Sequence, residues 1–170
     1  MKISVIGHCG SGKSTLSRTI SEQQATPHLE LDRLWFKHAD TRGDEAAKIL
    51  IKAKIKTDVE QFLSINESWV TDGIQNIVQN DISDAADLII FINIPLYRRQ
   101  WNHLKRVIKN RHRHPELSLW DELYFTWDMI RRTRLFAPQI KTILKNYPDK
   151  IQTARSYNDT ARLIAAIDKL

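Results

Sequence analysis

The residues with the clearest chemistry form one short stretch near the N-terminus, residues 7–14, with the sequence GHCGSGKS. It matches the pattern G-x-x-x-x-G-K-[ST], which forms a phosphate-binding loop when it follows a strand and opens a helix. Its glycines let backbone N–H groups point into a concavity, and the helix adds the positive end of its dipole. The stretch therefore predicts a site for a nucleoside triphosphate.

Individual roles within this loop follow from the chemistry of its side chains. Lys13 can reach the β- and γ-phosphates, and the Ser14 hydroxyl can ligate Mg²⁺. The expected cofactors are therefore a nucleoside triphosphate and Mg²⁺. We assign nucleotide binding to seven residues, namely Gly7, Gly10, Ser11, Gly12, Lys13, Ser14 and Thr15.

Two aspartates follow short apolar runs that read as strands, Asp32 at the end of 28–32 and Asp72 near the end of 68–73. Ligands of open α/β sheets bind beyond the carboxyl ends of the strands, so both carboxylates are expected beside the loop. Asp72 is a candidate ligand of Mg²⁺, usually through water. Asp32 is a candidate to orient or deprotonate an acceptor hydroxyl. The alternatives are a helix cap for Asp32 and a plain Asp-Gly turn at Asp72.

The positive charge is concentrated in one part of the chain. The net charge is +6, yet residues 98–145 hold twelve basic and four acidic side chains, and the remainder is slightly acidic. A solvated helix surface is one reading of this stretch. Neutralisation of a polyphosphate and binding of nucleic acid are the others.

The elements that must position these residues alternate between strands and helices. Five apolar runs read as strands, and the intervening segments have helical spacing of apolar residues, which predicts a three-layer parallel α/β domain. The predicted strands are 2–6, 28–32, 68–73, 87–94 and 150–154.

The last third of the chain is mostly helical in pattern. We expect a helix from Leu96 to about Asn110, a polar connection, and two helices over 119–135 and 139–146, separated at Pro138. The aromatic stripe of the first of this pair is expected in the core; its members are Trp120, Leu123, Tyr124, Trp127 and Ile130.

Length and composition narrow the class of protein further. The 170 residues suit one domain, and no apolar run is long enough to span a membrane. The first residues lack the pattern of a secretory signal, and the single cysteine excludes an internal disulfide. Both points favour a cytoplasmic protein.

With these pieces placed, the chain resembles the small P-loop kinases related to adenylate kinase and shikimate kinase. Among them it is most similar to the DNA topology modulation proteins. Five segments in family order carry the resemblance: the phosphate loop, Leu31-Asp32-Arg33-Leu34-Trp35, Trp69-Val70-Thr71-Asp72-Gly73, 86–92 and Arg131-Arg132-Thr133-Arg134.

The resemblance implies a P-loop NTPase fold with strand order 2-3-1-4-5. Residues 33–67 would form an acceptor-binding region, and about 95–149 would contain a basic helical lid. Lid arginines of such kinases grip the phosphates during transfer, and three positions match here: Arg106, Arg111 and Arg113. Arg131, Arg132 and Arg134 come next. Adenine often packs beside the loop that here contains Arg155 and Ser156.

One departure bears on the acceptor. Relatives usually show Asp-Gly-Asn-Tyr or Asp-Gly-Phe-Pro-Arg after the third strand, whereas this chain continues from Gly73 with Ile74, Gln75 and Asn76. The arginine that grips a nucleoside monophosphate is absent there. We therefore expect transfer of the γ-phosphoryl group of ATP to a small hydroxylated acceptor. The alternative is a nucleotide-switched ATPase that binds nucleic acid through its basic region. A GTPase switch is disfavoured because neither Asn-Lys-x-Asp nor Thr-Lys-x-Asp occurs.

Overall fold

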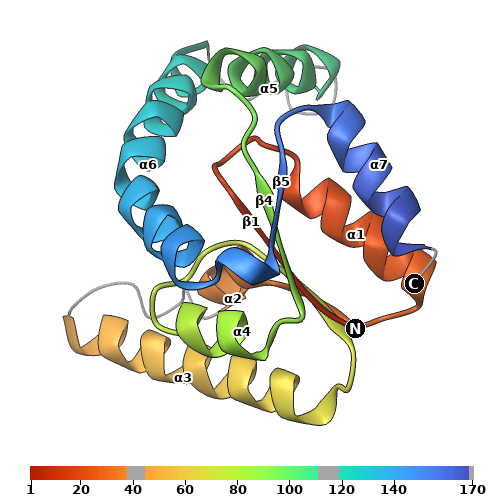
Figure 1. Ribbon diagram of the computed structural model, residues 1–170. Coiled ribbons are helices and arrows are strands. Elements are labelled where there is room, and N and C mark those ends of the chain that lie inside the picture. The colour runs from red at the N-terminus through yellow and green to blue at the C-terminus, as the bar shows by residue number, and fades with distance from the viewer. Residues whose placement is uncertain (38–44, 111–118, 169–170) are drawn as a thin grey trace.

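A computed structural model describes residues 1–37, 45–110 and 119–168. Its centre is a five-stranded parallel sheet in the order β2-β3-β1-β4-β5 (Figure 1). The strands are β1 (Lys2–Gly7), β2 (His28–Glu30), β3 (Trp69–Asp72), β4 (Leu88–Ile92) and β5 (Ile151–Ala154). The predicted strand order and the three-layer α/β architecture are confirmed.

Helices cover both faces of the sheet, because its strands are apolar on both sides. Helices α1 (Lys13–Gln24) and α7 (Tyr157–Ile167) pack on one face through Leu16, Ile20 and Ile167. The opposite face is covered by α2, α3, α4 and the second half of α6. Their bounds are Leu31–Lys37, Glu45–Ile65, Gln79–Ala85 and Leu119–Asn146.

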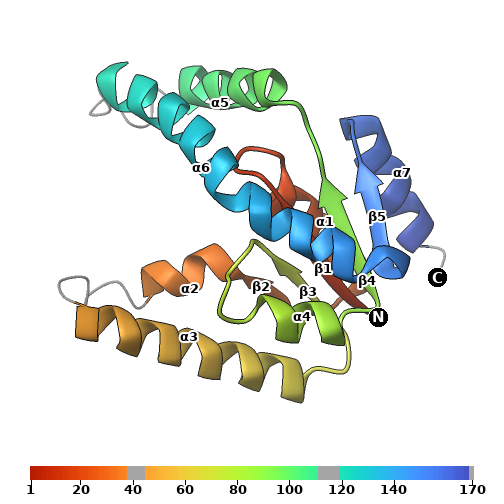
Figure 2. The same cartoon turned by 60° about the vertical axis from the view of Figure 1, so that its left-hand side comes forward.

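Helix α5 (Leu96–Asn110) crosses above the carboxyl ends of the central strands (Figures 1 and 2). The carbonyl of Pro95 accepts from the N–H groups of Arg98 and Arg99, so the proline stands just before the first turn, where its missing N–H costs nothing. Because β1 ends below α5, the sheet, α1 and α5 together enclose the loop 7–14.

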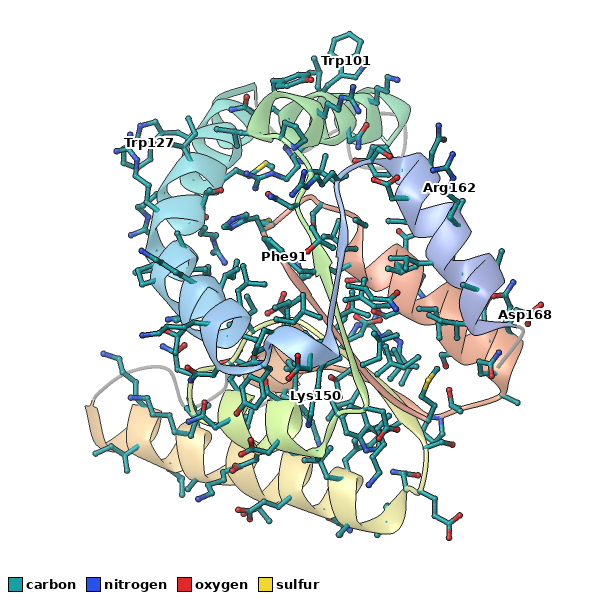
Figure 3. The ribbon with its side chains drawn as sticks, in the orientation of Figure 1. Phe91, Trp101, Trp127, Lys150, Arg162 and Asp168 are labelled. Atoms are coloured by element: carbon teal, nitrogen blue, oxygen red, sulfur yellow. The ribbon has the colours of Figure 1, made fainter. Side chains whose placement is uncertain are left out.

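Three sequence predictions are corrected by the structure. Pro138 lies inside one continuous helix, α6, and does not separate two. The apolar residues that follow it explain why, since Ile140 and Ile143 are buried in the core and hold the helix through the proline. Trp127 was expected in the core but is 62% exposed, on the outer side of α6 (Figure 3).

The third correction concerns Asp32. Strand β2 ends at Glu30, so Asp32 lies in the first turn of α2 and not at a strand end. It still follows the carboxyl end of β2 directly, and a carboxylate in the first turn is favourable for the helix dipole.

Among the helices that the structure describes, none has the length and apolar character that a membrane span requires.

Candidate functional site

The loop between β1 and α1 has the backbone that its glycines allow. Gly7 has φ +153°, and a Cβ there would lie 2.7 Å from the carbonyl oxygen of Ile92 on β4. Gly10 has φ +75°, a left-handed conformation that side chains disfavour. The N–H of Ser11 donates to the carbonyl of His8 at 3.2 Å, which closes the turn.

Lys13 begins α1 and folds back over the loop. Its Nζ donates to the carbonyl oxygen of His8 at 3.3 Å. His8 itself is neutral near pH 7, because burial, then Arg99, then Lys13 lower its pKa to about 4. The loop's positive potential therefore comes from lysine, arginine and the start of α1, with no imidazolium.

A cavity of about 490 Å³ opens against the loop. It is bounded by residues from α1, α2, α5, α6 and α7 as well as by the loop, and Asn102 of α5 donates a hydrogen bond to the Tyr157 hydroxyl of α7. Its lining comprises residues 9–16, Thr19, Asp32, Asn102, His103, Met129, Tyr157, Thr160 and Ile164. A triphosphate on the loop would lie inside this cavity.

Among the described residues that line the cavity, Asp32 is the one carboxylate. Burial raises its pKa, the positive charge of Lys13 opposes that shift, and Asp72 adds to it. Asp32 also lies against the loop after β3, where a Cβ at Gly73 would be 3.5 Å from Asp32 Oδ1. The structure thus brings Lys13, Asp32 and Asp72 close enough for their charges to interact.

Asp72 ends β3 and is 3% exposed. Its backbone is aligned with Val5 of β1, two residues before Gly7. Its Oδ2 is buried without a hydrogen-bond partner among the described residues, and His28 Nε2 stands 3.7 Å from its Oδ1. A buried, unpartnered carboxylate oxygen beside a phosphate loop fits a hard cation or its water shell.

The three predicted lid arginines cannot be placed by their side chains. Arg111 and Arg113 lie outside the described residues, and the structure describes only the backbone of Arg106, within α5. A different arginine stands near the cavity. Arg132 of α6 is close enough to Asp32 and Cys9 for their charges to raise its pKa, after the larger effect of its hydrogen bond to Asp128.

Asp128 organises the basic face of α6 at this point. It is 6% exposed, and both of its carboxylate oxygens accept hydrogen bonds, one from Arg131 Nε and one from Arg132 Nε. These bonds, led by that of Arg132, hold the pKa of Asp128 below its usual range. Sequence reasoning treated Asp128 only as one of four acids in a basic stretch.

Sequence reasoning also gave no role to Arg99, which the structure buries beneath the loop at 2% exposure. The position of Arg99 in the sequence did contain a sign of such a role. Arg99 falls in the first turn of a helix, where a cation opposes the helix dipole and needs another reason to be there. Its burial also removes it from the basic surface that the nucleic-acid alternative requires.

The comparisons with solved structures agree with this architecture. The shikimate kinase from Acinetobacter baumannii, solved with shikimate, superposes with a TM-score of 0.58 at 15% identity, over 98% of this chain and 89% of that one. The shikimate kinase from Bacteroides thetaiotaomicron gives 0.57 at 14% identity, over 99% and 96%. TT1252 from Thermus thermophilus gives 0.59 at 18% identity, over 100% and 97%.

Similarity at this level of identity establishes the fold. The chain has the P-loop NTPase fold that these proteins share, with sheet order β2-β3-β1-β4-β5. No family model matches the sequence, and no curated protein does. The narrower resemblance to the DNA topology modulation proteins stays a prediction.

Proposed function

We propose that this chain is an ATP-dependent phosphotransferase that moves the γ-phosphoryl group to a hydroxyl of a small acceptor. One observation carries the proposal: the cavity against the phosphate loop is lined by Asp32, a carboxylate whose pKa is raised by desolvation and which lies within the field of Lys13. A carboxylate at that position suits a hydroxyl acceptor, which needs a base, better than a phosphate acceptor, which needs arginines.

The chain's own residues have distinct tasks in this mechanism. The N–H groups of the loop and the Lys13 ammonium bind the phosphates of ATP, and Lys13 moves from the His8 carbonyl to reach them. Ser14 and Asp72 would hold Mg²⁺, which supplies charge neutralisation on the phosphate oxygens when bound. The buried, unpartnered Asp72 Oδ2 supports that assignment.

Asp32 accepts the proton of the acceptor hydroxyl as its oxygen attacks the γ-phosphorus, and ADP leaves with the electron pair of the broken P–O bond. Arg132, whose charge interacts with that of Asp32, is proposed to stabilise the charge of the transferring group. The lid arginines Arg106, Arg111 and Arg113 are proposed to join it. Residues 33–67 are proposed to bind the acceptor, and the cavity walls exclude water from the transfer.

The test is transfer of radiolabelled γ-phosphate from ATP·Mg²⁺ to a panel of sugars, polyols, nucleosides and nucleoside monophosphates. Lys13→Ala should lower turnover about 10²–10³-fold, because it removes a charge aimed at the transferring group. Lys141→Ala, an exposed lysine of α6, is the matched control and should behave as wild type.

Two outcomes would contradict the proposal at different points. If Lys13→Ala binds ATP as well as the wild type, the loop assignment is wrong. If the wild type binds ATP but phosphorylates no member of the panel, the protein is an ATPase or a switch. A preference for nucleoside monophosphates over hydroxylated acceptors would reverse the assignment of Asp32.

A further inference from the structure

Arg99 makes three hydrogen bonds to three separate parts of the molecule. Its Nε donates at 3.0 Å to the carbonyl of Ile94, which lies in the segment between β4 and α5. Its Nη1 donates to the carbonyl of Cys9 in the phosphate loop at 3.1 Å and to Thr133 Oγ1 of α6 at 3.1 Å. One guanidinium therefore ties the sheet, the loop and α6 together.

The hydroxyl of Thr133 has one hydrogen-bonding role on each side. Its hydroxyl donates to the carbonyl of Met129 at 2.7 Å, so its single proton is used and its oxygen accepts from Arg99. Met129 is 1% exposed and touches the loop directly, since a Cβ at Gly10 would lie 2.8 Å from Met129 Cε. The loop and the middle of α6 therefore meet through both polar and apolar contacts.

The charge of Arg99 is buried without a carboxylate beside it. In the described part of the chain, its hydrogen bonds all go to neutral oxygens. Burial of a cation is costly unless an anion offsets it, and the desolvation lowers the pKa of Arg99. The anion that reaches this place is the triphosphate of the proposed function, on the other side of the Cys9 peptide.

The same helix carries Arg132, which is near enough to Asp32 for the two charges to interact. Met129 and Thr133, which contact the loop and Arg99, lie next in sequence to Asp128 and Arg132, which bond to each other. The turn 128–133 of α6 thus contacts the loop through Met129 and, on the neighbouring side of the helix, holds Arg132 through Asp128.

We propose that Arg99 is a positioning residue, which transmits occupation of the phosphate loop to α6 and so sets Arg132 opposite Asp32. The proposal rests on the proposed function for the identity of the anion. Its distinctive claim is the coupling: nucleotide binding at the loop orders the turn 128–133, and this ordering depends on the fork of Arg99 and the hydroxyl of Thr133.

The test measures hydrogen exchange of the backbone amides of 127–135, with and without a non-hydrolysable ATP analogue and Mg²⁺, together with the affinity for that analogue. In the wild type, the analogue should slow exchange of this segment about threefold or more. Arg99→Lys keeps the charge but loses the fork, so it should bind the analogue about tenfold more weakly and lose the added protection at saturation.

Two pairs of variants separate coupling from folding. Arg98→Lys changes the neighbouring exposed arginine, which stacks over Tyr97, and should match the wild type in both measurements. Thr133→Val removes the hydroxyl at nearly constant shape and should abolish the added protection, while Thr133→Ser should restore it. This second pair decides the matter if Arg99→Lys does not fold.

The failures are distinguishable. Absence of binding by the wild type would overturn the proposed function itself. Binding by the wild type without any change in exchange at 127–135 would overturn the coupling and leave the function standing. Full protection of the segment in saturated Arg99→Lys and Thr133→Val would show that Arg99 has only a packing role.

Discussion

The cavity has two walls that are built in different ways. The phosphate-loop wall is one continuous stretch from Cys9 to Leu16, whose shape comes from positive φ angles at Gly10 and Gly12. The facing wall is assembled from Asp32 of α2, Asn102 of α5, Met129 of α6 and Tyr157 of α7, residues that are far apart in the sequence. The first wall owes its shape to its backbone and the second consists of side chains from separate helices, so single substitutions should affect them very differently.

The largest effect is expected on the side-chain wall at Asp32. Asp32→Asn removes the proposed base, and phosphoryl transfer to an identified acceptor should fall about 10²–10⁴-fold. Binding of the ATP analogue should be unchanged or tighter, because a negative charge beside Lys13 is lost. Steady-state kinetics and titration calorimetry measure the two quantities, with the exposed Asp149→Asn as control.

The pH dependence of this variant has a definite sign. Burial raises the pKa of Asp32 above its ordinary value of 3.8, so the ionised group costs folding stability once the pH exceeds the folded pKa. Asp32→Asn should therefore melt at a higher temperature than the wild type at pH 7. In the wild type, we expect kcat to fall at acid pH as Asp32 becomes protonated, with a midpoint above pH 3.8. Asp32→Asn should not show this fall. If Asp32→Asn turned over at the wild-type rate, Asp32 would not be the base.

The same contrast explains how much could be predicted from the sequence. The loop was predicted residue by residue because its function depends on glycines at fixed spacing, and strand order followed from the resemblance. Arg99, by contrast, has a role only because Cys9 and Thr133 come within reach of it, 90 and 34 residues away along the chain. No local pattern encodes such a contact.

The misjudged residues of α6 show the same limit. Apolar spacing placed Trp127 in the core, yet the neighbouring Asp128 and Met129 turn inward and Trp127 faces outward. Pro138 was read as a helix end by its local chemistry, and burial of Ile140 and Ile143 overrides it. In both cases the long-range packing of α6 decides, and that packing is what the sequence leaves undetermined.

The next effect in size is expected on the loop wall at Gly10. Gly10→Ala should lower the free energy of unfolding by about 1–3 kcal/mol, because the new methyl group is strained at φ +75° and meets Met129. Gly12→Ala is the matched comparison, since a Cβ there meets only Tyr157 at ordinary contact distance. Denaturant unfolding should rank Gly10→Ala as the less stable. Equal losses would mean that the contact with Met129 does not constrain the loop.

The smallest effect is expected where side chains only orient other side chains. Asp128→Asn removes the charge that accepts from Arg131 and Arg132, so Arg132 must be ordered anew in every turnover. Ordering one long side chain costs enough to lower kcat about three- to tenfold, whereas KM for ATP should stay unchanged because the loop is untouched. Asp168→Asn, exposed at the end of α7, is the control.

Because the bonds lower the pKa of Asp128, the stability they contribute is present above its ordinary pKa of 3.8 and is lost as the pH falls through the lower folded value. The stability difference between Asp128→Asn and the wild type should therefore be largest at neutral pH and shrink in acid. A rise in KM for ATP with kcat unchanged would instead place Asp128 and Arg132 with the loop wall, and the two walls would then act as one.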